Sequence, residues 1–479
     1  MVNREREDHY TRSKKGHNSE IEAAYHKGLA EFSGKIIVLD DDPTGTQTVH
    51  SVIVYTDWLK ETIRKGFNNE SSIFYILTNS RSFSENKTKQ VHQEIAQNIS
   101  EVSKELNQSF TIISRGDSTL RGHYPLETMT LREEIEKDNE TKIDGEILCF
   151  SFFEGERYTF DNNHYLKKNG EYIPISQTEF ANDPTFGFKS SNLIEYIAEK
   201  SHQPIDAQDI LTIPLEYLRE YRVDLIEKIL LSSHGFQKII INSTNYEELK
   251  VFVTALFNVM KKGKNYLFRT AASFPKVLAG IPDIDYLDRD TIVDKTNSNG
   301  GLIVIGSHVK LSTRQLSQLK ASKLPLAFIE FKVATYFDDP LFEMEVTRVK
   351  KFVQESIASG VSTVVYTSRE LLKPDLFDEE SALSMSVNIS SSLTKIVELL
   401  TIKPKYIISK GGITSSDIAT IGLKMTEGTV LGQVTAGIPV WLADINSKFP
   451  KMPYLIFPGN VGTVDTLRNV VEKLEGEFS

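Results

Sequence analysis

Residues 36–50 read IIVLDDDPTGTQTVH, an apolar run that ends in three aspartates and a Pro-Thr-Gly turn. The four apolar residues 36–39 predict a buried strand of a parallel sheet, because such strands are covered on both faces. Ligands of open parallel sheets bind at the carboxyl ends of the strands, and here Asp40, Asp41 and Asp42 follow. Adjacent carboxylates repel one another, so this end predicts a site for a polyol, a metal ion or a phosphate. The same letters are also typical of an ordinary turn.

Composition is that of an ordinary globular protein. The chain has 479 residues, of which 40% are hydrophobic and 25% charged, and this length predicts two domains. A net charge of −10 argues against general nucleic-acid binding. The single cysteine, Cys149, excludes an intrachain disulfide and is interpreted as a core thiol. No apolar run is long enough for a membrane span, and the N-terminus lacks a secretory signal, so a cytoplasmic enzyme is expected.

Strands and helices alternate along the chain, which predicts an α/β fold with mainly parallel sheets in two domains. We expect a polar extension at 1–33, a first domain at 34–287, a linker at 288–300 and a second domain at 301–479. Residues 154–203 predict loops and short hairpins. Further strands are predicted at 51–55, 73–77, 110–113, 147–153, 238–241, 268–272, 302–305, 326–331, 362–366, 406–409 and 454–457. Helices are predicted at 85–106, 246–260, 343–359, 381–400 and 415–421.

Charge and hydroxyl groups follow two other strands of the first half. Residues 78–82 read TNSRS and residues 114–123 read SRGDSTLRGH. Arginine makes paired hydrogen bonds with a carboxylate, while Asp and Ser bind hydroxyls. These segments therefore predict a site for a small hydroxy acid. The alternative is a solvated loop with an internal Arg–Asp pair.

Glycine follows strands in the second half. Residues 409–417 read SKGGITSSD, and a helix that begins near Thr414 or Ser415 would direct backbone N–H groups at a phosphate, with Lys410 adding charge. The alternative is a plain strand-to-helix turn with a Ser or Thr cap. Gly306-Ser307 and residues 457–462, FPGNVG, form two similar ends. Neither a P-loop motif nor a G-x-G-x-x-G motif occurs, so a standard P-loop or dinucleotide fold is not supported.

Six segments taken together resemble one family. They are DDPTG at 41–45, TNSRS at 78–82, RGDSTLRG at 115–122, GS at 306–307, GGITS at 411–415 and PGNVG at 458–462. Their order and spacing are similar to those of the four-carbon acid sugar kinases, from about residue 34 to 470. The resemblance implies a sugar-acid domain, a nucleotide domain and an active site in the cleft between them. It also implies phosphoryl transfer from ATP to a hydroxyl of 3-oxo-tetronate, threonate or erythronate.

The resemblance implies a role for each matched position. Those facing the sugar acid would be Asp41 or Asp42, Arg81, Arg115, Gly116, Asp117 and Ser118. Those facing ATP would be Ser307, Gly411, Gly412, Ile413, Thr414 and Gly459. Phe457 stands where the family often has lysine, which removes a phosphate contact. The expected partners are a sugar acid and ATP, with neither nucleic acid nor membrane, and a homodimer is one option for the assembly.

A mechanism follows as a hypothesis. Arg81 and Arg115 hold the substrate carboxylate, Asp117 and Ser118 fix its hydroxyls, and Asp41 or Asp42 positions and deprotonates the attacking hydroxyl. Phosphoryl transfer requires mainly alignment and charge neutralisation. Mg²⁺ is expected because it bridges the phosphates in this chemistry, although its protein ligands are not identified.

Two alternatives stay open at this point. Asp40, Asp42 and Thr44 satisfy the D-x-D-x-[TV] pattern of a haloacid-dehalogenase-type, metal-dependent phosphatase. A sugar-acid sensor without ATP turnover is the other, because Phe457 departs from the family pattern.

Overall fold

The computed structural model describes residues 19–138, 141–201, 209–307, 309–337, 339–368 and 390–476. The chain forms two compact units. The first comprises the chain up to Asp41 together with Asp57–Pro282, and the second comprises Asp42–Thr56 together with the chain from Asp283. The sequence placed 42–56 in the first domain. It belongs to the second unit because β2 (Val52–Tyr55) pairs antiparallel with β16 (Glu427–Thr435).

The first unit is built on a parallel sheet with the strand order β3-β1-β4-β11-β5-β10-β9. Register places Asp40, the last residue of β1, opposite Leu77 of β3 and Arg115 of β4. The carboxyl ends of these strands therefore meet at one edge, as parallel topology requires. The strands are β1 (Lys35–Asp40), β3 (Ile73–Leu77), β4 (Phe110–Arg115), β5 (Gly145–Cys149), β9 (Ile210–Ile213), β10 (Gln237–Ile241) and β11 (Tyr266–Thr270).

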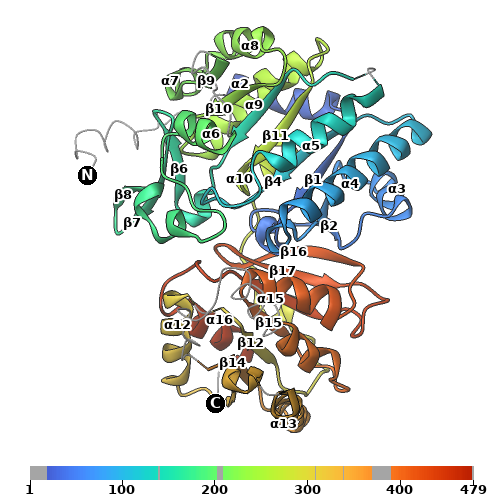
Figure 1. The fold of residues 1–479 in the computed structure, drawn as a ribbon, viewed down its shortest axis with the longest axis vertical. Helices are drawn as coiled ribbons and strands as arrows, with labels where there is room; N and C mark the ends of the chain where they lie inside the picture. The colour runs from blue at the N-terminus through green and yellow to red at the C-terminus, as the bar shows by residue number, and fades with distance from the viewer. Residues whose placement is uncertain are drawn as a thin grey trace. The chain divides into compact units, whose positions relative to one another are not determined.

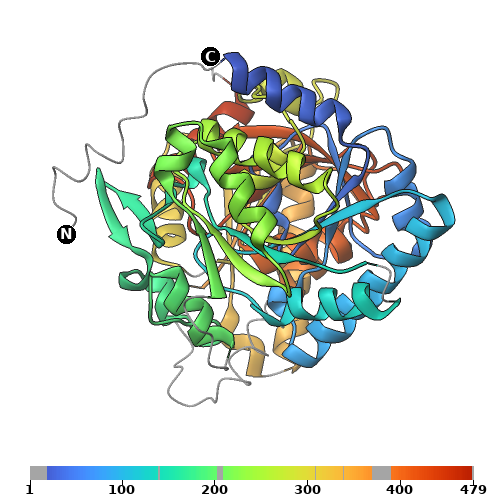
Figure 2. The same cartoon turned by 90° about the horizontal axis from the view of Figure 1, so that it is seen from above.

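Helices of the first unit form two packed groups (Figures 1 and 2). In one group α4 (Glu85–Leu106) packs against α3 (Lys60–Asn68) and α5 (Leu126–Ile135). In the other α9 packs against its neighbours. That group consists of α2 (Ser19–Glu31), α7 (Leu215–Arg219), α8 (Val223–Ser232), α9 (Tyr246–Met260) and α10 (Ser273–Leu278). The periodic apolar residues of α4 are buried, and the Ser84 hydroxyl accepts a hydrogen bond from Lys87 N–H at 3.4 Å as the N-cap.

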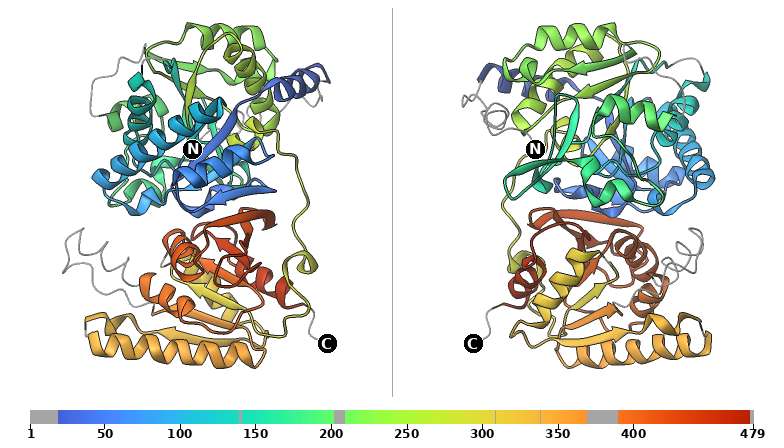
Figure 3. Two further views of the ribbon diagram at one scale, coloured as in Figure 1. Left: turned by 90° about the vertical axis from the view of Figure 1, so that its right-hand side faces the viewer. Right: turned by 60° about the vertical axis from the view of Figure 1, so that its left-hand side comes forward.

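Residues 154–203 contain a separate antiparallel sheet, which confirms the predicted hairpins (Figure 3). Its strands are β6 (Arg157–Phe160), β7 (Asn163–Lys168) and β8 (Glu171–Pro174), followed by α6 (Leu193–Ser201). Stacked aromatic rings, among them Phe160 and Tyr165 with centroids 4.2 Å apart, form its own small core. We refer to β6–β8 as the small sheet.

The second unit has the strand order β13-β14-β12-β15-β18-β17-β16-β2. The parallel strands are β12 (Leu302–Ile305), β13 (Ala327–Phe331), β14 (Thr363–Thr367), β15 (Ile407–Lys410) and β18 (Pro453–Phe457). The sequence missed the antiparallel pair of β16 with β17 (Ile438–Ala443). The long helix α13 (Asp339–Ala358) packs against β13 and β14 (Figure 3). The other helices are α11 (Arg289–Ile292), α12 (Lys310–Lys320), α15 (Gly412–Asp417) and α16 (Thr466–Glu475).

Two predicted segments of the second half differ from the structure, and a third is only partly described. The expected linker 288–300 contains α11, because the Asp288 side chain caps it through Thr291 N–H at 2.7 Å. The helix predicted at 415–421 begins earlier, at Gly412, and continues as a π-helix over Ile418–Gly422. Of the helix predicted at 381–400, residues 381–389 lie outside the described residues. Within the described ranges, none of the helices combines the length and the apolar character that a membrane span requires.

Candidate active site at the strand ends

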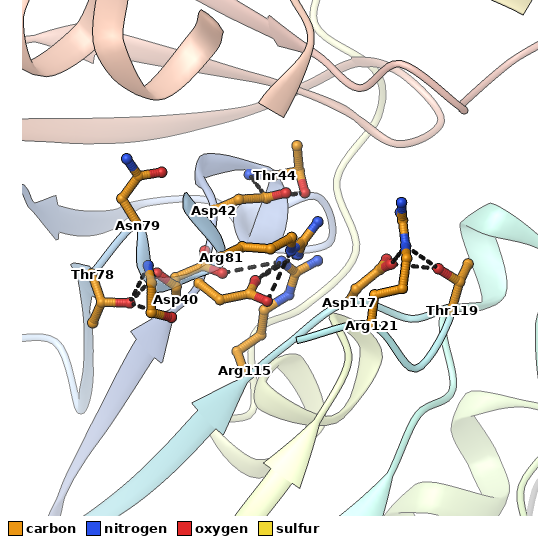
Figure 4. A network of polar contacts seen from close by, with 12 residues as sticks. Asp40, Asp42, Thr44, Thr78, Asn79, Arg81, Arg115, Asp117, Thr119 and Arg121 are labelled. Atoms are coloured by element: carbon orange, nitrogen blue, oxygen red, sulfur yellow. Dashed lines mark hydrogen bonds and ion pairs between the residues drawn. The ribbon is translucent and has the colours of Figure 1, made fainter. Parts of the chain in front are cut away.

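Two arginines are paired with aspartates at the end of β1 (Figure 4). Asp41 accepts from Arg81 through both oxygens, with Nη2–Oδ1 at 2.7 Å and Nε–Oδ2 at 3.1 Å. Nη1 of Arg115 lies 3.1 Å from Asp40 Oδ1 and 3.4 Å from Asp41 Oδ1. Both aspartates and Arg115 are buried, whereas the Arg81 side chain is 19% exposed. The two arginines expected to hold a substrate carboxylate are thus already bound to carboxylates of the chain.

Asp42 has a different role from its neighbour. Its backbone is extended, and its Oδ1 accepts from Thr44 N–H at 2.7 Å and from the Thr44 hydroxyl. It therefore caps the 3₁₀ turn η1 (Pro43–Thr46), so the Asp-Pro-Thr-Gly segment is also a turn. Within the second unit, a Cβ atom at Gly412 would lie 3.1 Å from Asp42 Oδ2. Two consecutive aspartates thus belong to different units of the chain.

The loop after β4 contains the internal Arg–Asp pair named as an alternative. Asp117 accepts from Arg121 Nε at 2.6 Å and from the Thr119 hydroxyl (Figure 4). Burial alone would raise the pKa of Asp117, but the charges of Arg121 and Arg81 lower it well below its usual range. Asp117 is thus ionised at neutral pH. Ser118 is buried, and its carbonyl accepts from His164 Nε2 of the small sheet at 2.7 Å.

The side chain of Arg269, on β11, fills the space next to two glycines of this loop, where a larger residue would not fit. A Cβ atom at Gly116 would overlap the Arg269 guanidinium, and one at Gly122 would lie 2.7 Å from its Nη2. Gly116 therefore makes room for a buried cation, and its own N–H donates to Thr270 O at 2.9 Å. The sequence reading missed Arg269. An arginine inside the apolar run YLFRT was the available signal, because a buried charge requires a partner.

Glu127 of α5 is that partner, and the sequence reading missed it as well. Its carboxylate pairs with Arg269 and accepts from the Ser80 hydroxyl at 2.6 Å and the Ser114 hydroxyl at 3.3 Å. Burial would raise its pKa, but the Arg269 charge and the weaker effects of His92 and Ser80 lower the pKa of Glu127 to about 2. It joins Ser80, which follows β3, to Ser114 of β4 and Arg269 of β11. No local pattern marks it, since its partners are distant in sequence.

Three glycine-bearing strand ends of the second unit converge. A Cβ atom at Gly459 would lie 2.8 Å from Ser307 Oγ, and one at Gly306 would overlap the Thr414 hydroxyl. The Ser307 hydroxyl accepts from Ser312 at 3.0 Å. Segments that the sequence could only place in order are therefore brought within contact distance.

Gly411 has φ +126° and ψ 140°, a conformation that is essentially restricted to glycine. Its N–H donates to Phe457 O at 3.0 Å, so this group is used within the fold. Gly412, Ile413 and Thr414 follow in the first turn of α15. Helix geometry leaves N–H groups of a first turn without partners in the helix. The phosphate-facing N–H groups would then be those of 412–414 and not that of Gly411.

Lys410, expected to add charge at a phosphate, is buried in the structure. It is fully buried, and its Nζ donates to Pro458 O at 2.9 Å and lies 3.9 Å from the centre of the Phe457 ring. Phe457 is itself fully buried in the core of this unit. Because both side chains point into the core, the aromatic ring stabilises the buried ammonium group.

One cluster of carboxylates has the geometry of a cation site. Asp40, Asp41 and Asp42 each offer an oxygen, and these oxygens lie within 4.8 Å of one another. No other group of acidic, His or Cys ligands of this kind occurs in the described part of the chain. Oxygen donors of this type suit Mg²⁺.

Two family models match this chain. A sugar-binding N-terminal domain matches residues 36–278, and a nucleotide-binding C-terminal domain matches residues 302–467. A comparison with curated proteins finds no match.

Solved structures share the fold over nearly the full chain. A Salmonella typhimurium LT2 protein described as a tRNA synthase candidate is 13% identical, with a TM-score of 0.64, covering 91% of this chain and 98% of that one. A Haemophilus influenzae protein of the DUF1537 family is 16% identical, with a TM-score of 0.57, covering 91% and 100%. A DUF1537 protein from Bordetella bronchiseptica, crystallised with citrate as a domain-swapped dimer, is 14% identical over 93% and 100%, with a TM-score of 0.38. On the two domain matches, the chain belongs to the DUF1537 or four-carbon acid sugar kinase family.

Proposed function

We propose that this protein is an ATP-dependent kinase that phosphorylates a hydroxyl of a four-carbon acid sugar. One observation carries the proposal. The chain passes from Asp41, in the arginine-rich strand ends of the sugar-binding domain, directly to Asp42, beside Gly412 in the nucleotide-binding domain. Neighbouring carboxylates so placed suit a reaction between a sugar hydroxyl and a nucleotide phosphate.

The charge of the first site supports an anionic, hydroxylated substrate. Arg81 and Arg115 pair with Asp41 after β1. Arg121 pairs with Asp117 in the loop after β4 (Figure 4). Guanidinium groups bind a carboxylate, and the ionised aspartates accept hydrogen bonds from sugar hydroxyls. Arg81, whose side chain is 19% exposed, is the more exposed of the predicted pair.

The second site supports a polyphosphate. Gly412 and Gly459 let the Asp42 and Ser307 side chains lie close to the backbone, and the first turn of α15 supplies N–H groups suited to phosphate oxygens. Asp42 is the carboxylate of this unit that we propose for Mg²⁺, since oxygen ligands suit this hard cation and Asp41 is bound to arginine. When bound, Mg²⁺ would neutralise phosphate charge.

The kinase proposal has a direct test. The purified chain is incubated with ATP, Mg²⁺ and each of threonate, erythronate and their oxo forms, and ADP release is followed. We expect release that depends on one of these acids. Release of ADP without any dependence on the acid, or no release across the panel, would contradict the proposal. Threonate binding without ATP binding, measured by calorimetry, would support the sensor.

The phosphatase alternative is disfavoured by the position of Asp40. In that mechanism the first aspartate of D-x-D must reach a phosphate. Asp40 is 0% exposed, and its carboxylate is paired with Arg115. A buried, ion-paired carboxylate is a poor nucleophile, because attack would break the pair and leave the buried arginine uncompensated. Phosphate release from a sugar phosphate in the absence of nucleotide would restore this alternative.

A further inference from the structure

Arg157, the first residue of β6, is a buried cation that makes no ion pair with a carboxylate in the part of the chain that the structure describes. Arg157 is 4% exposed, and its Nη1 donates to the Gly155 carbonyl. The guanidinium carbon lies 5.7 Å from the centre of the Phe152 ring. Within the described ranges, its Nε has no hydrogen-bond partner and no carboxylate forms an ion pair with it. The sequence alone predicted only loops and hairpins here.

The other arginines near these strand ends all have carboxylate partners. Arg81 and Arg115 pair with Asp41, while Arg121 pairs with Asp117 and Asp183. A buried charge that lacks a partner is costly, and natural proteins normally pair it or use it. Burial accordingly lowers the pKa of Arg157 to about 10, which still leaves it charged at neutral pH. An anionic ligand would supply the missing partner.

The surroundings of Arg157 connect it to the predicted substrate loop. Asp117 is the charge that most favours its protonated form. In the same small sheet, His164 holds the Ser118 carbonyl at 2.7 Å through Nε2, and its Nδ1 lies 2.9 Å from the Thr159 hydroxyl. The small sheet thus holds the loop through Ser118 and also carries Arg157 at the start of β6.

Gly155 preserves the position of this guanidinium. A Cβ atom there would overlap Arg157 Nη1 and the Phe152 ring. Its φ lies outside the left-handed region, so alanine would meet a steric obstacle and not a backbone one. The turn before β6 therefore depends on glycine for the space that Arg157 occupies.

We propose that Arg157 binds the carboxylate of the acid sugar and that the small sheet sets the preference for acids over neutral polyols. This inference rests on the proposed function. It assigns the carboxylate to Arg157, whereas the sequence had assigned it to Arg81 and Arg115, which are occupied by Asp41. Guanidinium binds a carboxylate through two parallel hydrogen bonds, which a neutral polyol does not offer.

The test compares one acid with its neutral counterpart. Binding of threonate and of threitol to the full chain is measured by calorimetry. For Arg157→Gln we expect threonate affinity to fall by about 10- to 100-fold, because a charged hydrogen bond is lost, while threitol and ATP affinities stay unchanged. Arg157→Lys should restore part of the threonate affinity. Gly155→Ala keeps the charge of Arg157 but displaces its guanidinium group, so it should also lower the affinity for threonate.

Arg132→Gln is the matched control, since Arg132 also lies over a phenylalanine, Phe236, at 4.8 Å and has its own partner Glu136. Equal loss of threonate and threitol binding in Arg157→Gln, or a fall in melting temperature alone, would overturn the proposal. Threonate binding that depends on Arg157 without ADP release would uphold this role and overturn the kinase. ADP release together with an unchanged preference for threonate over threitol in Arg157→Gln would uphold the kinase and overturn this role of Arg157.

Discussion

The two sets of strand ends present different kinds of chemical group. In the first unit, charged side chains are buried in ion pairs, as with Asp41 and Arg81 or Glu127 and Arg269. In the second unit, glycines and hydroxyls dominate, as with Gly411, Gly459 and Ser307. Side-chain charges discriminate a small acid by position, whereas backbone N–H groups bind phosphate oxygens of any nucleotide. The comparison predicts that mutations in the two regions affect different ligands.

The largest effect is expected at the aspartates where the chain passes from one region to the other. Asp41 and Asp42 are the carboxylates proposed as the general base, and we expect Asp41→Asn or Asp42→Asn to lower kcat by about 10²- to 10⁴-fold, because proton transfer would be lost. Asp41→Asn should also raise the KM for the sugar acid. Asp42→Asn should also raise the KM for MgATP. Steady-state kinetics with each substrate varied checks both.

Asn at 42 still accepts a hydrogen bond from Thr44, so the turn should remain intact. Near-normal turnover in both variants would remove the base role from this pair. If Asp41→Asn instead raised the KM for MgATP and Asp42→Asn raised the KM for the sugar acid, the two carboxylates would face the opposite ligands.

Glu127→Gln should cost about 3–5 kcal/mol of stability, because Arg269 would remain buried and unpaired. The folded-state pKa of Glu127, about 2, is below its ordinary value of 4.5. The stability that this carboxylate contributes is therefore complete above pH 4.5 and is lost as pH falls toward 2. Denaturant unfolding at several pH values measures both effects.

Glu248→Gln is the control, since Glu248 is a buried carboxylate paired with Arg219 at 2.8 Å outside the strand ends. Both variants should lose stability. Only Glu127→Gln should also raise KM for the sugar acid, since Glu127 fixes the Ser80 and Ser114 hydroxyls. A KM effect of equal size in both would show that Glu127 acts only on stability.

Gly411→Ala should lower the affinity for ATP by about 10- to 100-fold. Alanine at φ +126° costs on the order of 1–3 kcal/mol and would shift the first turn of α15. Threonate affinity should be unchanged. Calorimetry with each ligand separates the two. Gly360→Ala, also at positive φ (+83°) but before β14, is the control and should leave ATP affinity intact.

The smallest effect is expected at His164. Burial lowers its pKa to about 4, below the ordinary 6.5, so the unfolded chain binds the proton more tightly. Stability should be complete above pH 6.5 and should fall as pH drops from 6.5 toward 4. His164→Gln should cost about 1 kcal/mol at pH 8 and should reduce this pH dependence. An unchanged slope between pH 4 and 6.5 would contradict it.

Some of the site follows directly from local sequence. The apolar run 36–39 and the acidic residues after it indicated a strand and its ligand-facing end, and Asp41 lies there in the structure. Residues 78–82 and 114–123 predicted a site for a small hydroxy acid, with an internal Arg–Asp pair as the alternative, and the structure contains the Asp117–Arg121 pair. The strand and this pair could be predicted because strand, turn and charge patterns are encoded by near neighbours, whereas the ligand roles stay predictions.

Other features depend on partners far along the chain. Glu127 and Arg269 meet although 142 residues separate them. Arg157 was not identified, because an exposed arginine and a buried one look alike in a sequence. The pair β16 and β17 was missed for the same reason, since a register is chosen by the partner strand.

The sequence by itself determined the α/β class, the strand ends and the types of group that follow them. Only the tertiary structure decided which of those groups are buried or paired with other groups of the protein. It placed Lys410 in the core, engaged Arg81 and Arg115 with aspartates, and separated Asp41 from Asp42. The physical reason is that a charge is neutralised by whatever lies within a few ångströms of it, and that distance is set by the fold and not by the order of residues.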